Sequence, residues 1–338
     1  EKVLPSGERK GFFAGHGTGV GKGRIIASII LDNWNRGRKK AIWISEKKKL
    51  FDDAKRDLGY DKSRKSESGI GWGEGADKIF GLKTKLGKAI PNKEGILFTT
   101  YSTLGSKFGD INEREPSTLR DLNIRINQIA KWAGKDYDGV IAFDESHNMS
   151  NSRAQRGERG TKKAALMALA GVALQQRLPK ARVVYVSATG ATEVTNLAYA
   201  ERLGLWGEGT AFGNKDAFIT GISAAGISAM ELVARDLKAQ GLYLAPTLSY
   251  DGVFYDKIVH ALDEKQRSKY DELAAAWQIV LHNIQDALGE TMQGEDGNKR
   301  GAIWSQFWGG QQRFFNQVIT TMQMGSGIAH IEMQLEAG

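Results

Sequence analysis

A glycine-rich run at residues 15–24 constrains the fold of this chain more than any other feature. It follows a short apolar stretch, 11–14, and precedes a second one, 25–31, so the order is strand, loop, helix. Glycines let backbone N–H groups converge on a phosphate chain, and the N-terminus of the helix adds positive potential. The run therefore predicts a nucleotide-binding loop within an α/β sheet.

The loop matches a phosphate-binding motif with two departures. The usual pattern is G-x-x-x-x-G-K-[ST]. His16 stands where the first glycine belongs, and Gly23 stands where a Ser or Thr hydroxyl would reach Mg²⁺. Residues 19–22 instead fit the shorter G-x-G-K form of helicase-type loops. We expect the nucleotide to contact Gly17, Thr18, Gly19, Val20, Gly21, Lys22, Gly23 and Arg24; the alternative is a strand–helix turn that binds no ligand.

A second motif lies more than a hundred residues later. The apolar run 137–143 has the length of a strand, and Asp144, Glu145, Ser146 and His147 follow it. Acids at the carboxyl end of a buried parallel strand are typical of an α/β nucleotide site. We expect Asp144 to hold Mg²⁺, directly or through water, and Glu145 to orient and deprotonate the attacking water. His147 would link this site to a neighbouring segment. The alternative is a helix N-cap with an acid in the first turn.

Two further apolar runs end in hydroxyl residues. The run 183–186 leads into Ser187 and Thr189, which we expect to hydrogen-bond the segment 144–147 and couple it to nucleotide state; they would otherwise cap the next helix or turn. The run 96–99 leads into Thr100 and Tyr101. Hydroxyls at such a strand end can contact a nucleic-acid backbone, although they are equally ordinary strand-end residues.

In this order the motifs resemble the first RecA-like domain of superfamily 2 helicases and translocases. The stretches 11–24, 182–193, 202–210 and 312–315 narrow the resemblance to the strawberry notch family. The Gly23-Arg24 ending fits that family, which more often has Cys where this chain has Ser146. The resemblance implies a RecA-like P-loop NTPase sheet flanked by helices, with ATP and Mg²⁺ as cofactors. It also implies ATP hydrolysis coupled to nucleic acid or chromatin. Similar domains of bacteria, plasmids and phages occur in large multidomain proteins.

A superfamily 2 motor also needs a second RecA-like domain, which supplies an arginine finger. The sequence contains no Q-x-x-G-R-x-x-R run, and it begins with Glu1 rather than Met. We therefore expect this chain to be a segment of a longer protein whose second RecA-like domain is its partner. The isolated segment would bind ATP and hydrolyse it poorly.

The charge balance favours a polyanionic partner. The net charge is +8, and Lys47, Lys48 and Lys49 follow the expected strand 41–45, near the edge where open α/β sheets bind ligands. We expect these lysines to contact nucleic acid, DNA rather than RNA; the alternative is a solvated helix start. Cysteine is absent. No apolar run approaches the ~18 residues of a membrane span, so we expect no membrane contact. The expected location is the cytoplasm of a bacterial or phage-infected cell, or the nucleus if the source is eukaryotic.

The remaining pattern predicts two parts. Residues 1–200 form the RecA-like ATP-binding domain, with strands near 11–15, 40–45, 95–100, 138–144 and 182–187 and a loop or insertion at 59–95. Residues 201–338 form a mostly helical segment leading toward the second domain, with helical patterns at 213–222, 227–241 and 266–288. Asp263 and Gln266 could form a capping box. We expect the aromatic residues at 304–315 to pack rather than to stack on bases.

Three classes of function fit these features. The first is an ATP-dependent helicase or translocase motor segment. The second is a regulatory or scaffold domain that uses ATP as a switch without translocating. The third is a P-loop enzyme acting on small molecules, against which the acid motif, the Ser187 strand end and the basic balance all argue.

Overall fold

The computed structural model describes residues 2–17, 19–61, 66–67, 69–105, 124–150, 155–157, 160–162, 166–188, 194–246, 257–291 and 297–336. The chain divides into two compact units, Glu1–Ser249 and Tyr250–Gly338. The boundary expected at residue 200 lies inside the first unit, because β11, a strand at 243–244, pairs with the first strand of the sheet.

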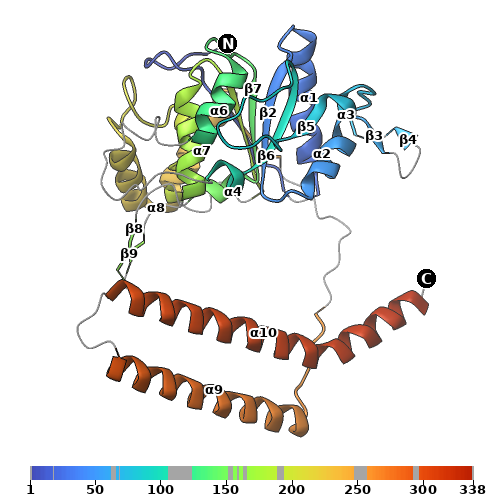
Figure 1. Cartoon of the computed structure of the whole chain (residues 1–338), viewed down its shortest axis with the longest axis vertical. Helices are drawn as coiled ribbons and strands as arrows, with labels where there is room; N and C mark the ends of the chain where they lie inside the picture. The colour runs from blue at the N-terminus through green and yellow to red at the C-terminus, as the bar shows by residue number, and fades with distance from the viewer. Residues whose placement is uncertain are drawn as a thin grey trace. The chain divides into compact units, whose positions relative to one another are not determined.

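A seven-stranded parallel sheet forms the centre of the first unit (Figure 1). Its strands, in spatial order, are β11 (Tyr243–Leu244), β1 (Phe12–Ala14), β10 (Arg182–Val186), β7 (Val140–Asp144), β2 (Lys40–Ser45), β6 (Gly95–Thr100) and β5 (Ile79–Gly81). The five strands expected from the sequence are confirmed, and the expected RecA-like α/β class holds. β5 and β11 are additional, and β5 shows that the segment 59–95 is only partly loop.

Both faces of the sheet are covered by helices, as its continuous apolar strands require. Alternate residues of one strand enter different cores: Ala41 and Trp43 pack with α1 (Lys22–Asn35) and α2 (Leu50–Leu58). Ile42 and Ile44 pack on the other face, where Figure 1 shows α4 (Tyr101–Leu104), α6 (Ile124–Ala133) and α7 (Leu166–Arg177). The shorter elements are α3 (Gly75–Lys78), the strand pairs β3 (Tyr60–Asp61) with β4 (Ser66–Glu67) and β8 (Gln155–Gly157) with β9 (Gly160–Lys162), and the 3₁₀ turns η3 (Ser146–Met149), η4 (Val194–Leu197) and η5 (Glu201–Leu203).

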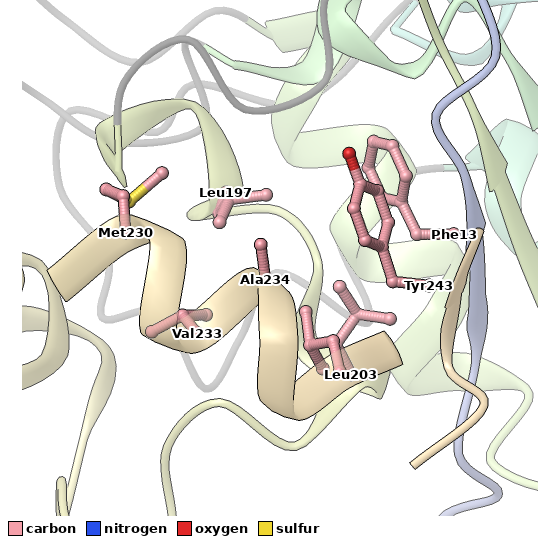
Figure 2. Close-up of a pocket in the computed structure, with 8 residues that line it drawn as sticks. Phe13, Leu197, Leu203, Met230, Val233, Ala234 and Tyr243 are labelled. Carbon is pink, nitrogen blue, oxygen red and sulfur yellow. The ribbon is translucent and has the colours of Figure 1, made fainter. Parts of the chain in front are cut away.

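Helix α8 (Lys215–Ala239) packs against η4 and β11. The two helical patterns expected here form one helix with a break at Gly226, whose φ of 75° and ψ of −158° are not helical. Figure 2 shows α8 packing with Met230, Val233 and Ala234 toward Phe13 and Tyr243. The gap left there is about 20 Å³ and apolar, so it is a packing defect rather than a ligand site.

Among the described residues, α8 is also the one helix whose length and composition would suit a membrane span. Its most apolar 18-residue window has a mean hydropathy of 1.6, and 17% of that window is buried inside the protein. The expectation that no stretch of the chain approaches such a span therefore needs correction at α8. Phe218, Ile219 and Ile222 are nevertheless buried in a core of their own within the first unit.

The second unit contains two long helices, α9 (Glu264–Thr291) and α10 (Gly297–Glu336). The expected capping box is confirmed: the Gln266 backbone N–H donates to Asp263 Oδ1 at 2.7 Å, and the Asp263 N–H donates to Gln266 Oε1 at 3.1 Å. Trp277 of α9 lies 5.4 Å from Phe307 and 5.6 Å from Phe314 of α10, between ring centroids. The aromatic residues therefore join the two helices, as the packing interpretation predicts.

Candidate nucleotide site

The glycine loop joins β1 to α1 at the carboxyl edge of the sheet. Gly19 and Gly21 have φ angles of 82° and 77°, a left-handed conformation that residues with a Cβ rarely adopt. Gly21 precedes α1, and no side chain caps that helix, so its first N–H groups can meet a phosphate. Thr18 lies outside the described residues. The geometry is that of an anion cradle.

Lys22 begins α1 and faces the acid motif. Its Nζ donates to the Gly17 carbonyl at 3.4 Å and lies 3.6 Å from Glu145 Oε1. Lys22 is 10% exposed, which strengthens its electrostatic interactions relative to those of a surface lysine. The first two expected motifs therefore meet in one site, although they are separated by more than a hundred residues.

Glu145 has an unusual backbone. Among the described residues other than glycine it is the one with positive φ, at 49°. Both the backbone N–H and the side-chain amide of Asn148 donate to the Glu145 carbonyl, at 3.0 and 2.9 Å, and hold this turn. Such conformations cost on the order of 1 kcal/mol and concentrate at functional sites. This outlier supports the hypothesis that Glu145 is placed for function rather than for capping.

His147 links the acid motif to the neighbouring strand, as expected. Its Nδ1 lies 3.4 Å from Glu145 Oε2 and 3.0 Å from Ser187 Oγ. β10, which leads into Ser187, lies between β1 and β7, so this contact sits at the centre of the edge. The hydrogen bond predicted for Ser187 is present, whereas Thr189 lies outside the described residues.

Asp144 ends β7 and accepts a hydrogen bond from the Ser45 hydroxyl at 2.8 Å. Burial raises the pKa of Asp144 to about 6, and the charge of Glu145 adds to this; the Ser45 hydrogen bond and the charge of Lys22 oppose it. Ser45 comes from the end of β2 and is fully buried. A divalent cation would relieve the cost of the ionised carboxylate, since Mg²⁺ typically takes one or two carboxylates and keeps water and phosphate ligands.

The described residues suit that mode of metal binding. Within the described ranges, no three His, Cys, Asp or Glu side chains gather where an ion could sit. The protein would therefore supply Asp144, and the phosphates and water would supply the rest. The residues present fit ATP with Mg²⁺.

The residue in place of the usual Ser or Thr is explained by a neighbouring helix. A Cβ added to Gly23 would lie 1.9 Å from Asp57 Oδ2, which is closer than atoms can approach. Burial raises the pKa of Asp57, and the nearby Arg56 and Arg24 partly offset this. A Ser or Thr at residue 23 would therefore require the Asp57 side chain to move. Arg24 is exposed and Val20 is half-buried.

His16, in place of the first motif glycine, is 8% exposed. Burial, followed by the charge of Lys22, lowers its pKa. The imidazole beside the loop is therefore neutral at physiological pH.

The residues expected to contact nucleic acid separate into two groups. Lys47, Lys48 and Lys49 are exposed between β2 and α2, on the same edge as the glycine loop. Thr100 and Tyr101 are only 2% and 1% exposed. Thr100 accepts from the Thr103 N–H, and the Tyr101 hydroxyl donates to the Asp144 carbonyl at 2.8 Å. These two side chains therefore support the site from beneath instead of facing a polymer.

A buried polar chain behind the site has no counterpart in the sequence analysis. The hydroxyls of Ser146 and Tyr199 lie 3.0 Å apart, and Gln175 Nε2 donates to the Tyr199 carbonyl. Arg202, 0% exposed, donates to four backbone carbonyls, those of Arg9, Gln175, Leu178 and Pro179. These hydrogen bonds fix η5 and the end of α7 against the sheet. Each contact joins distant segments, so no local pattern could have revealed it.

The same sequence features occur in known proteins. The sequence model of the family described as "P-loop containing NTP hydrolase pore-1" matches residues 1–272. The fruit fly Drosophila melanogaster protein strawberry notch is 38% identical over 330 residues, which are 97% of this chain and 19% of the fly protein. The chain belongs to the strawberry notch family of P-loop NTP hydrolases.

Relatives in other organisms agree with this. The strawberry notch homolog of Caenorhabditis elegans is 40% identical over 93% of this chain and 16% of the worm protein. Protein FORGETTER 1 of Arabidopsis thaliana is 36% identical over 93% of this chain and 22% of its own length. The chain thus spans about a fifth of the length of these relatives, and it carries the P-loop NTP hydrolase region.

Proposed function

We propose that this chain is the ATP-binding segment of a helicase- or translocase-like motor that acts on nucleic acid. The observation that carries the proposal is the convergence of Lys22, Glu145, His147 and Ser187 at one edge of the sheet. Family membership supports nucleotide hydrolysis. The coupling to a polymer rests on the exposed lysines and on the Glu145–His147–Ser187 contact.

The geometry of these side chains suggests how the site works. Lys22 and the uncapped N-terminus of α1 would hold the β- and γ-phosphates. Bound Mg²⁺ would neutralise phosphate charge beside Asp144. Lys22 would leave Glu145 for the phosphates, which frees the carboxylate to orient water and accept its proton. His147, within reach of both Glu145 and Ser187, would then report the state of the site to β10.

The polymer would bind at the carboxyl edge, where Lys47, Lys48 and Lys49 provide sequence-independent phosphate contacts. We propose DNA rather than RNA as the track. We also propose a second RecA-like domain of the same longer protein as the source of an arginine finger, so that the present chain alone hydrolyses ATP slowly. Its location, in cytoplasm or nucleus, remains a prediction.

The test is ATP hydrolysis by the full-length protein with and without duplex DNA, single-stranded DNA and RNA. Glu145→Gln is the blank, because an amide cannot accept the proton of the water while ATP binding persists. Stimulation by one polymer, lost in Glu145→Gln, supports the motor and identifies its track.

Two results would contradict the proposal. Hydrolysis that no polymer changes, or no hydrolysis at all, would favour the nucleotide-switch or scaffold function. Normal turnover by Glu145→Gln would make Glu145 structural. Lys22→Ala serves as the binding control, since it removes the charge that meets the phosphates.

A further inference from the structure

A second cavity of the first unit lies at the opposite, amino edge of the sheet. It measures about 340 Å³, within the range of small-molecule sites. Phe12, Ile29 and Val184 form apolar parts of its wall, and its cationic residues are Lys2, Arg9, Lys10 and Arg182. No carboxylate is among the described residues that line it. The cavity is therefore both apolar and strongly positive.

Two of the cations are held together by one neutral residue. Lys2 Nζ donates to the Gln240 carbonyl at 2.6 Å, and Lys10 Nζ donates to Gln240 Oε1 at 3.3 Å. An ammonium group has three N–H donors, so these bonds leave donors on both lysines. Two like charges gathered at one amide are stabilised by an anion placed between them, most of all by one with more than a single charge.

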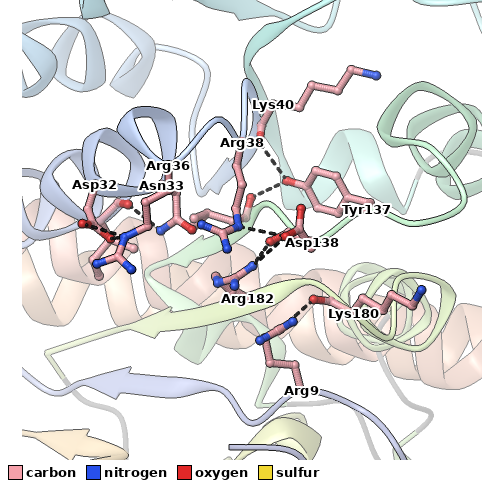
Figure 3. A network of polar contacts seen from close by, with 12 residues as sticks. Arg9, Asp32, Asn33, Arg36, Arg38, Lys40, Tyr137, Asp138, Lys180 and Arg182 are labelled. Atoms are coloured by element: carbon pink, nitrogen blue, oxygen red, sulfur yellow. Dashed lines mark hydrogen bonds and ion pairs between the residues drawn. The ribbon is translucent and has the colours of Figure 1, made fainter. Parts of the chain in front are cut away.

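The third and fourth cations belong to a network that fixes their positions (Figure 3). Arg9 Nε donates to the Lys180 carbonyl at 3.0 Å. Arg182 lies 3.3 Å from Asp138 Oδ2, which also accepts from Arg38 Nε at 2.9 Å. Burial opposes ionisation of Asp138, but the hydrogen bond and charge of Arg38, with those of Arg182, lower its pKa. One carboxylate thus serves two guanidinium groups.

From this combination we infer that the amino-edge cavity binds a nucleoside phosphate, with its phosphate at Lys2 and Lys10 and its flat apolar part against Phe12 and Ile29. A phosphate monoester carries about −1.5 to −2 charges at pH 7, which suits paired ammonium groups better than a single carboxylate does. The ligand is a free nucleotide, or a single-stranded nucleic acid whose neighbouring phosphodiesters, with one negative charge each, meet the two lysines. This site is separate from the glycine loop and does not depend on the proposed motor function.

The experiment uses the 338-residue chain carrying Lys22→Ala, which removes the lysine that is expected to bind phosphate at the glycine loop. Two probes are titrated by fluorescence anisotropy: ADP with a fluorophore on the ribose, and a labelled oligothymidylate of ~12 nucleotides, a length typical of single-strand sites. The test variant adds Lys2→Glu and Lys10→Glu. The control adds Lys257→Glu and Lys265→Glu, an equal charge change at exposed lysines of the second unit.

We expect the test variant to weaken binding of at least one probe more than ten-fold relative to the control. Loss for ADP identifies a free nucleotide, and loss for the oligonucleotide identifies a nucleic-acid strand. In the second case, the slope of log affinity against log salt should also fall by ~1.4, since each lost single-strand phosphate contact contributes ~0.7. Lys2→Gln with Lys10→Gln should give an intermediate loss, and thermal melting checks that every variant is folded.

Equal affinity of test and control variants for both probes would overturn the inference, as would the absence of measurable binding to the Lys22→Ala chain itself. ATP hydrolysis by the longer protein with an intact Lys22 separates the two proposals. The Lys2 and Lys10 changes should leave basal hydrolysis as it is, whatever the motor test shows.

Discussion

At the scale of single residues, Gly23 shows how a departure from a motif can be structural. Comparison with the usual pattern would suggest that a serine at 23 restores a metal ligand. The structure predicts the opposite, because the added Cβ would meet Asp57. We expect Gly23→Ser to lower the free energy of unfolding by about 1–3 kcal/mol, a typical cost of overpacking, without improving hydrolysis.

Chemical denaturation of single and double variants measures this effect. Asp57→Ala makes room at residue 23, so Gly23→Ser should cost much less in that background than in the native one. Additive costs in the double variant would show that Asp57 is not the obstacle.

Asp144 provides a prediction that depends on pH. Its pKa is about 6 in the folded chain, against ~3.9 for an unperturbed aspartate. The folded state therefore holds a proton that the unfolded state has lost between these values, and stability falls as pH rises through this window. Asp144→Asn avoids the buried charge. It should stabilise the chain without nucleotide or metal by up to about 3 kcal/mol above pH 7 and abolish hydrolysis.

Urea denaturation in the presence of a chelator, at pH 4 and at pH 8, tests this. The advantage of Asp144→Asn should be present at pH 8 and small at pH 4. An equal effect at both pH values would mean that packing or the Ser45 hydrogen bond, rather than ionisation, determines the difference.

The residues of the site could be predicted only where the sequence carries them as a motif. Lys22, Glu145 and His147 stand in recognisable patterns. Ser45 and Asp57 do not, because each acts through a partner that a different element brings to it. The burial of Thr100 and Tyr101 was equally unpredictable. Hydroxyl residues at a strand end have the same sequence pattern whether they face solvent or pack against Asp144.

At the scale of elements, the break in α8 depends on the backbone conformation of a single glycine. Gly226 has φ 75° and ψ −158°, a region open almost exclusively to glycine. We expect Gly226→Ala to destabilise the chain by about 1–3 kcal/mol, although alanine favours helices in general.

Gly289→Ala is the matched control. Gly289 lies in α9 without positive φ, and nothing lies within 4 Å of its added Cβ, so the change should be neutral or stabilising by up to ~1 kcal/mol. Thermal melting of both variants gives the comparison. A stabilising effect at Gly226 would indicate that the helix can run straight.

The elements themselves were predictable where they are long. The five strands of the sequence prediction are apolar runs bounded by polar residues, and the capping box located the start of α9. β5 and β11 have only three and two residues, which is too short for a periodic pattern, and no motif follows them as the glycine loop follows the equally short β1. β11 moved the unit boundary, because its pairing with β1 is a long-range contact that composition does not encode.

At the scale of the whole molecule, every described residue of the nucleotide site belongs to the first unit. A fragment of residues 1–249 should therefore bind ATP with an affinity within about two-fold of that of the 338-residue chain, because no group that meets the phosphates is removed. Isothermal titration calorimetry on both proteins measures this, with Lys22→Ala in each as the blank. A ten-fold weaker fragment would assign part of the binding energy to residues 250–338.

The pairing of β1 has a consequence for synthesis. Among the strands of the sheet β1 is synthesised first, yet its two neighbours are β10, at 182–186, and β11, at 243–244. At typical translation speeds, the roughly 170 residues between β1 and β10 take on the order of 10 s to appear, during which β1 has no strand beside it. β1 therefore cannot take its place in the sheet until β10 has been made.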